Sequence, residues 1–139
     1  MTENEISKII LDSAIEVHKS LGGPGLLESV YEESLAWELE SRGLKIERQI
    51  EVPIRYKGRL LATPLRLDLL VNNLVIVEVK AVAVYNKVFE AQALTYLRLM
   101  DLRLAMVINF GDTKVGSGTH RVVNGLDENW RPGIKAIAS

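Results

Sequence analysis

Four charged side chains stand at even-numbered positions in residues 65–82, a stretch that is otherwise apolar except for two asparagines. The odd positions of its two predicted strands are all apolar, whereas the even positions include Arg66, Asp68, Glu78 and Lys80. Alternate side chains of a β-strand share one face, so the odd residues predict a core face. The other face also carries leucine, isoleucine and valine. We therefore expect it to be covered as well, and covered charges need partners or an ion.

A predicted turn over residues 72–74 determines which residues of the two strands face each other. Its two asparagines accept positive φ angles, and a three-residue turn pairs Val71 with Val75. The same register sets Asp68 opposite Glu78, with Cβ atoms about 5 Å apart. Like charges at that distance destabilise each other unless a proton or a cation lies between them. Mg²⁺ suits such a pair, because it takes one or two carboxylates and completes its shell with water and phosphate.

Lys80 adds an ammonium group to this predicted pair of carboxylates. It lies two residues beyond Glu78 and emerges on the same face of the strand, where it can orient or deprotonate a water beside the ion. A metal and an ammonium together stabilise charge developing on phosphorus, which favours phosphodiester hydrolysis. The alternative is an ion-pair ladder of Arg66, Asp68, Glu78 and Lys80 on a wet sheet face, with no ligand.

The hydrophobic spacing predicts the elements that position these groups. Two amphipathic helices, separated by a glycine-rich turn, come first; three strands, a helix and two strands follow. A turn at Lys57 and Gly58 separates the first two strands. The expected helices span residues 5–20, 26–41 and 86–100, and the expected strands span residues 44–56, 59–71, 74–84, 103–110 and 120–123.

Four short motifs together carry a family resemblance. In chain order they are Gly25-Leu-Leu-Glu28-Ser-Val-Tyr31, Arg66-Leu-Asp68, Glu78-Val-Lys80 and Gln92-x-x-x-Tyr96. This combination resembles the GxxExxY proteins, which are assigned to the PD-(D/E)XK nuclease superfamily. The resemblance extends from the first helix to the last predicted strand. It implies a restriction-endonuclease-like α/β fold with an αβββαβ core, in which helices flank a central mixed sheet, and the predicted order of elements agrees.

The resemblance also implies roles for individual residues. Asp68 and Glu78 match the metal-binding acids, Lys80 matches the catalytic lysine, and Glu28 matches a helix glutamate that completes the metal shell, directly or through water. The implied cofactor is Mg²⁺ or Mn²⁺. Leu67 stands where the superfamily has a proline before the aspartate. From the residues alone, Glu28 near a helix start is equally explained by a favourable interaction with the helix dipole.

Four further residues are candidates for contacting substrate or supporting the site. Gln92 and Tyr96 match positions that face the site in the superfamily, and their i, i+4 spacing places both on one helical face. Arg66 belongs to the motif around Asp68. Tyr31 is also explained as a core aromatic residue with a satisfied hydroxyl, and we favour that explanation over catalysis.

Composition limits the remaining possibilities. The chain has 139 residues, 47% of them hydrophobic and 25% charged, which predicts one domain over residues 1–139 with a loosely packed tail at 126–139. The absence of cysteine excludes disulfides and thiolate metal sites. No apolar run is long enough to cross a bilayer and no secretory signal is visible, so we expect a cytoplasmic protein without membrane contact.

Charge is unevenly distributed along a chain whose net charge is −1. Residues 42–66 carry seven basic and two acidic side chains, which fits either a polyanion or a solvated sheet face. Our leading hypothesis is a divalent-metal-dependent nuclease acting on DNA or RNA. The alternative is a catalytically silent, nuclease-derived binding module that acts with a protein partner or as a homodimer, which the small size and weak net charge favour.

Overall fold

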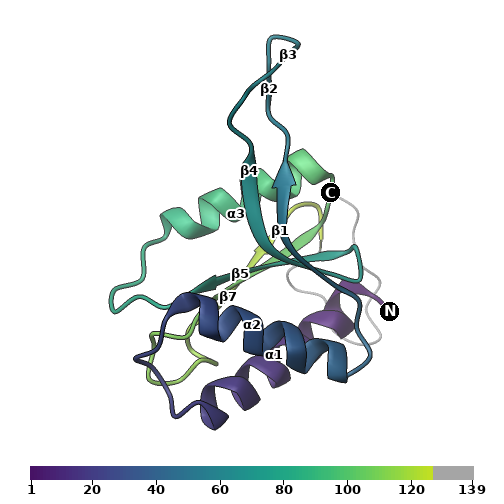
Figure 1. The fold of residues 1–139 in the computed structure, drawn as a ribbon. Helices are drawn as coiled ribbons and strands as arrows, with labels where there is room; N and C mark the ends of the chain where they lie inside the picture. The colour runs from purple at the N-terminus through teal and green to yellow at the C-terminus, as the bar shows by residue number, and fades with distance from the viewer. Residues whose placement is uncertain (127–139) are drawn as a thin grey trace.

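A mixed five-stranded sheet forms the centre of the molecule (Figure 1). The computed structural model describes residues 1–126, so most of the tail predicted at 126–139 lies outside the described residues. The strand order is β1-β4-β5-β6-β7; β5 and β6 are parallel, and the other neighbours are antiparallel. The strands are β1 (Ile46–Val52), β4 (Leu65–Val71), β5 (Val75–Lys80), β6 (Leu104–Asn109) and β7 (Thr119–Val123).

Three helices flank this sheet, which confirms the predicted fold class. Helices α1 (Glu3–Ser20) and α2 (Glu28–Ser41) lie against one face, and α3 (Val88–Met100) lies against the other (Figure 1). Thr2 starts α1 with a capping box, in which its side chain and that of Glu5 each accept a hydrogen bond from the other's backbone amide. Within the described residues, no helix is both long and apolar enough to span a membrane.

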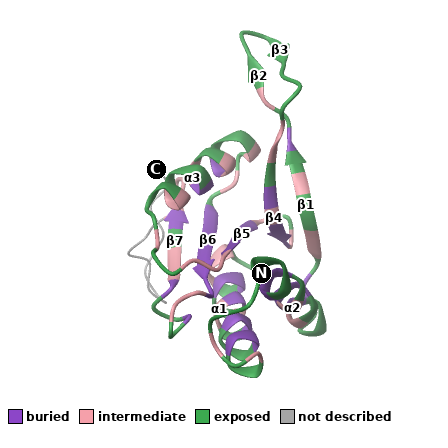
Figure 2. Ribbon diagram, turned by 60° about the vertical axis from the view of Figure 1, so that its left-hand side comes forward, coloured by how far each residue is buried: buried purple, intermediate pink, exposed green. Residues whose placement is uncertain are grey.

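Two hydrophobic clusters hold the layers together, one on each face of the sheet (Figure 2). The prediction that the odd residues of β4 share one core face is wrong for Leu65 and Leu67. Leu69 packs in the cluster under α1 and α2, whereas Leu67 packs in the cluster under α3. The regular alternation of side chains is interrupted between these leucines, where Gln49 of β1, with φ +51°, lies between the pairs Arg48–Leu69 and Ile50–Leu67.

The two longest predicted strands are each interrupted. A separate hairpin of β2 (Arg55–Tyr56) and β3 (Arg59–Leu60) projects beyond the sheet (Figure 1), and we call residues 54–61 the arm. Pro53 and Pro64 stand where the chain leaves and rejoins the sheet, since proline cannot donate a ladder hydrogen bond. The turn predicted at the tip is present, and its two residues have φ +49° and +78°.

Candidate functional site

The candidate site lies where β4 separates from β5. The predicted register is present, with Val71 opposite Val75, and backbone pairing continues to Leu69 and Val77. Beyond that point, side-chain carboxylates accept hydrogen bonds from backbone amides in place of the regular pairing between the strands. The Asp68 amide donates to Glu78 Oε2 at 3.1 Å, and the Val79 amide donates to Asp68 Oδ2 at 2.8 Å. Each carboxylate therefore binds the opposite strand, and the two acids converge as the turn geometry predicted.

Burial makes this pair of carboxylates electrostatically demanding. Glu78 is only 5% exposed, and Asp68 is half-buried beside it. Loss of hydration raises the pKa of Glu78 to about 9, and the neighbouring Asp68 charge acts in the same direction. A proton or a cation must therefore accompany the two acids at neutral pH.

Lys80 contributes a positive charge that acts on this pair. Its Nζ lies 4.7 Å from the centre of the Phe89 ring on α3, a distance typical of a cation–π contact. The ammonium opposes the upward shift in the pKa of both Glu78 and Glu28. Lys80 is half-buried, and its contact with the Phe89 ring restricts the positions that its flexible side chain can adopt. The structure thus brings the lysine to the acids.

The strand end that carries Lys80 is fixed by Asn109, which the sequence analysis missed. The fully buried Asn109 side chain accepts a hydrogen bond from the Val82 amide and donates one to the Val82 carbonyl, both at 3.0 Å. The Phe110 amide donates to the Lys80 carbonyl at 2.8 Å. Gly111 lies so close to Val82 that an added Cβ would stand 2.7 Å from the Val82 nitrogen. The end of β6 therefore holds the backbone of residues 80–82 through three consecutive residues.

Glu28 approaches the acids from the first turn of α2. Partial burial raises its pKa, the Asp68 and Glu32 charges add to that rise, and Lys80 opposes it. The glycine-rich loop before α2 includes Gly25 at φ +116°, a conformation that side-chain-bearing residues rarely adopt. Glu28 is exposed, in contrast to Glu78, and so remains open to solvent.

Tyr31 anchors this loop from beneath and lies in the core. Its ring is fully buried and stacks on Phe110 at 4.7 Å. Its hydroxyl donates to the Gly23 carbonyl at 2.6 Å and accepts from the Leu26 amide at 3.2 Å. The tyrosine is therefore a satisfied core aromatic residue that positions the segment leading into Glu28.

A second acid, Glu32, lies one helical turn after Glu28 and was not predicted. It is buried, and Arg48 Nη2 and Gln49 Nε2 donate to its two oxygens at 3.0 and 2.6 Å. Gln49 Nε2 also lies 3.4 Å from Asp68 Oδ1, so it bridges the two acids. Burial raises the pKa of Glu32, and Arg48 opposes that rise. The i, i+4 spacing from Glu28 was the available sequence signal.

Asp68, Glu28 and Glu32 line an open hollow of about 630 Å³ on the α2 side of the sheet. Its lining residues are Leu27, Glu28, Ser29, Glu32, Gln49 and Asp68. On the α3 side, burial raises the pKa of Tyr96, and the charges of Glu78 and Asp68 raise it further. Gln92 is exposed one turn earlier. Side chains of both α2 and α3 therefore lie near the carboxylate pair.

Arg66 stands apart from the carboxylate pair, although the motif links it to Asp68. It is exposed, and its Nη2 donates to Glu51 Oε1 on β1 at 2.9 Å. This is the kind of cross-strand pair that the ion-pair-ladder alternative predicts.

The chemistry of the site fits a divalent cation. Asp68 and Glu78 present carboxylate oxygens, which Mg²⁺ and Mn²⁺ prefer, and burial together with the Asp68 charge raises the pKa of Glu78, so a cation beside the pair would be favoured. Residues 1–126 contain no cluster of three or more histidine, aspartate or glutamate side chains placed to hold an ion. Two protein ligands, with water and phosphate completing the shell, are consistent with Mg²⁺.

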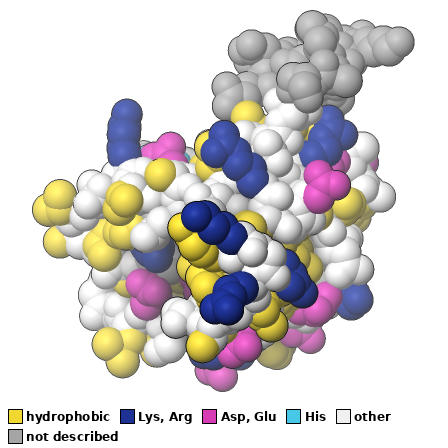
Figure 3. Space-filling model, turned by 90° about the horizontal axis from the view of Figure 1, so that it is seen from above, with side chains coloured by type: hydrophobic (Ala, Val, Ile, Leu, Met, Phe, Trp, Pro, Cys, Tyr) yellow, Lys and Arg dark blue, Asp and Glu magenta, His cyan; other side chains and the backbone are white. Residues whose placement is uncertain are grey.

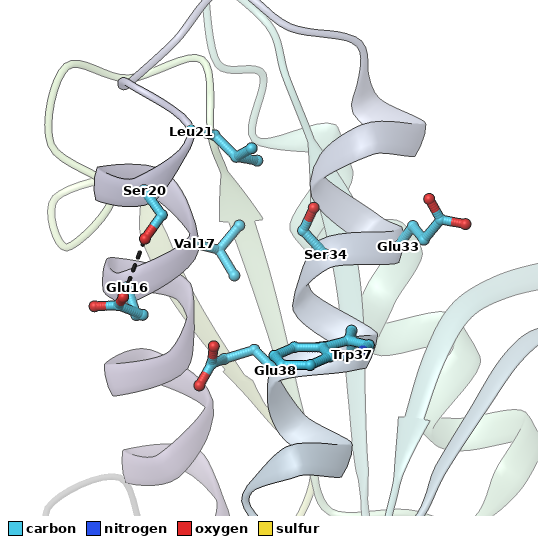
Figure 4. A pocket seen from close by; sticks show the side chains of 8 residues that line it. All are labelled: Glu16, Val17, Ser20, Leu21, Glu33, Ser34, Trp37 and Glu38. Carbon is cyan, nitrogen blue, oxygen red and sulfur yellow. Dashed lines mark hydrogen bonds between the residues drawn. The ribbon is translucent and has the colours of Figure 1, made fainter.

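A second hollow, of about 550 Å³, lies between α1 and α2 (Figure 4). Val17 of α1 and Leu21, the residue that follows α1, lie across this hollow from Ser34 and Trp37 of α2, and Trp37 is 69% exposed. Glu16, Glu33 and Glu38 add acidic groups around it. This hollow contains no lysine and no paired carboxylates of the kind described above, so the two hollows differ in chemistry.

A comparison with family models gives one match for this chain. The model of the PD-(D/E)XK nuclease superfamily matches residues 4–122, which include every candidate site residue. Neither the curated proteins nor the solved structures give a significant match. The finer assignment to the GxxExxY proteins stays a prediction.

Proposed function

The chain belongs to the PD-(D/E)XK nuclease superfamily, and from that premise we propose that it hydrolyses phosphodiester bonds in nucleic acid with the help of Mg²⁺ or Mn²⁺. One observation carries the proposal. Asp68 and Glu78 each bind the backbone of the other's strand, with the Lys80 ammonium close enough to affect the pKa of Glu78. A solvated ion-pair ladder does not account for the burial of Glu78.

Asp68 and Glu78 would hold the ion, and Glu28 would support it directly or through water. A bound divalent ion supplies Lewis-acid stabilisation of charge developing on a phosphate. The Lys80 ammonium, placed over the Phe89 ring, orients the attacking water and stabilises negative charge on the phosphate oxygens. Tyr96 and Gln92 face the substrate from α3, and Tyr31 positions the loop before Glu28. A cytoplasmic location stays a prediction.

The test is a cleavage assay on single-stranded, duplex and structured DNA and RNA, with Mg²⁺, Mn²⁺ or EDTA. Wild type should cleave at least one substrate only with metal, and Asp68→Asn and Lys80→Gln should each lower the rate at least a hundredfold. Lys114→Gln, which removes an exposed lysine from a loop, is the matched control and should retain full activity. Absence of metal-dependent cleavage by wild type on the whole panel would refute the proposal.

A catalytically silent partner-binding module is the second candidate, because the α1–α2 hollow exposes Trp37 beside acidic residues. Under that function Trp37→Ala would abolish partner binding, whereas Asp68→Asn would leave it unchanged. Co-purification with each variant distinguishes the two functions.

A further inference from the structure

The arm carries cations that differ from the other basic residues of its segment. The remaining four basic side chains of residues 42–66 each form an ion pair with a glutamate, at 2.9 to 3.6 Å; they are Arg42, Lys45, Arg48 and Arg66. Among the ion pairs formed within residues 1–126, none includes Arg55, Lys57 or Arg59. The cations without an acidic partner in this segment are therefore those of the arm.

The hairpin register distributes these cations over both faces of the arm. Arg55 lies opposite Leu60, and Tyr56 lies opposite Arg59, so each face combines one arginine with one large apolar side chain. Lys57 occupies the turn, with its Nζ 5.5 Å from the Tyr56 ring centre. Figure 3, which looks down from the top of Figure 1, shows Lys and Arg side chains among hydrophobic ones on this side. A protein-docking hairpin would instead gather its apolar residues on one face.

The arm is exposed without contributing to the core. Tyr56 and Leu60 are 58% and 59% exposed, and within the described chain the arm residues belong to neither hydrophobic cluster. Folding of such a projecting hairpin gains little free energy from the burial of apolar surface. Its exposed cations and apolar side chains therefore favour contact with an external ligand.

We propose that the arm is a duplex-DNA-binding element that enters the major groove, with Arg55 and Arg59 facing the phosphates of the two flanking strands. The major groove of B-form DNA is about 12 Å wide and admits a two-stranded β-ribbon, whereas the major groove of A-form RNA is deep and narrow. Lys57 at the tip adds a third cation, and Tyr56 and Leu60, which share faces with Arg59 and Arg55, offer apolar contact to the walls of the groove. This inference deepens the proposed nuclease function by naming its substrate class.

The distance from the arm to the acids suits a duplex. Arg59 and Asp68 are nine residues apart, so an extended chain separates them by no more than about 30 Å at about 3.3 Å per residue. That length corresponds to about nine base pairs at about 3.4 Å each. The arm would therefore contact the duplex within about one helical turn of the phosphate at Asp68 and Glu78.

The test measures binding in EDTA, so that it does not depend on turnover. The triple variant Arg55→Gln/Lys57→Gln/Arg59→Gln is compared with the control Lys8→Gln/Lys19→Gln/Lys114→Gln, which removes the same charge from exposed lysines outside the arm. Fluorescence anisotropy is recorded with a 24-base-pair DNA duplex, the matching RNA duplex and a 24-nucleotide single strand. Melting temperature checks that each variant folds, and sedimentation gives its oligomeric state.

We expect the arm variant to bind duplex DNA at least tenfold more weakly than wild type, while the control keeps its affinity. The slope of log K against log salt should fall by up to about 2.7, since each phosphate contact contributes about 0.9. Unchanged affinity for duplex DNA would overturn the inference, as would an equal loss on the RNA duplex. A dimeric wild type that becomes monomeric without losing DNA affinity would assign the arm to a contact between copies instead. Arm-dependent binding without metal-dependent cleavage would refute the proposed catalysis alone.

Discussion

Glu78→Gln should stabilise the metal-free protein at neutral pH. Burial raises the pKa of Glu78 from 4.5 to about 9, so between these values the folded protein binds a proton that the unfolded chain has released. Because the folded state binds more protons, the unfolding free energy falls as the pH rises through this range. Glutamine keeps an oxygen to accept the Asp68 amide and does not titrate. The substitution therefore removes the pH-dependent penalty.

The size of the effect follows from the same interval. One pKa unit corresponds to about 1.4 kcal/mol, so the interval from 4.5 to pH 7 sets an upper bound of about 3–4 kcal/mol. Relaxation around the charge and water entering the open hollow reduce this cost, and we expect a gain of about 1–2 kcal/mol at pH 7. Below pH 4.5 the two proteins should have equal stability, because Glu78 is then protonated in both states.

The assay is urea denaturation in EDTA from pH 4 to pH 8.5, with Glu40→Gln as the control for an exposed glutamate on α2. Mg²⁺ should then stabilise wild type and leave Glu78→Gln unaffected, because the ion replaces the proton only where a carboxylate is present. Equal stability of wild type and Glu78→Gln at every pH in EDTA would refute the reasoning.

Two further substitutions test how the site is positioned. Tyr31→Phe should lower the unfolding free energy by about 1 kcal/mol, because it removes the hydroxyl that binds the Gly23 carbonyl and the Leu26 amide; urea denaturation measures the change, and wild-type stability would show that the hydroxyl does not hold the loop. Gly111→Ala should cost about 2 kcal/mol or more, because the new Cβ meets the Val82 backbone. Thermal melts measure this loss; Gly116→Ala, whose added Cβ meets nothing within 4 Å, should be nearly neutral, and equal effects at both glycines would contradict the close approach.

Local signals predicted the carboxylate pair, because the turn that determines its register lies within the same hairpin. Both asparagines of that turn have the positive φ angles expected, at +51° and +57°, and Val71 pairs with Val75. The alternation rule then failed at Leu65 and Leu67, since the interruption coincides with the positive φ of Gln49 in another strand. No local pattern marks glutamine for that conformation.

The residues that the sequence analysis missed depend on partners distant in the chain. Asn109 binds the backbone of Val82, 27 residues earlier, and Glu32 binds Arg48 and Gln49, which lie 16 and 17 residues later. Spacing rules cover one helix or one hairpin and do not bring such pairs together. The interruption of the strand predicted over residues 44–56 has a local cause, Pro53. The sequence analysis gave more weight to the alternation of the neighbouring residues than to this proline.

Strand β4 connects the two surfaces to which we assign function. Its N-terminal end continues from the arm, and Asp68 lies in its middle, where pairing with β5 ends and pairing with β1 continues to Leu65. The strand is held between two neighbours at Leu69–Val71 and by β1 alone at Leu65–Leu67. Where β4 separates from β5, side chains replace the backbone hydrogen bonds between the two strands. The same separation lets the β1–β4 ribbon leave the sheet toward the arm. Because a one-residue slip would turn every side chain of β4 to the other face, the register that pairs Asp68 with Glu78 also determines how the arm is presented.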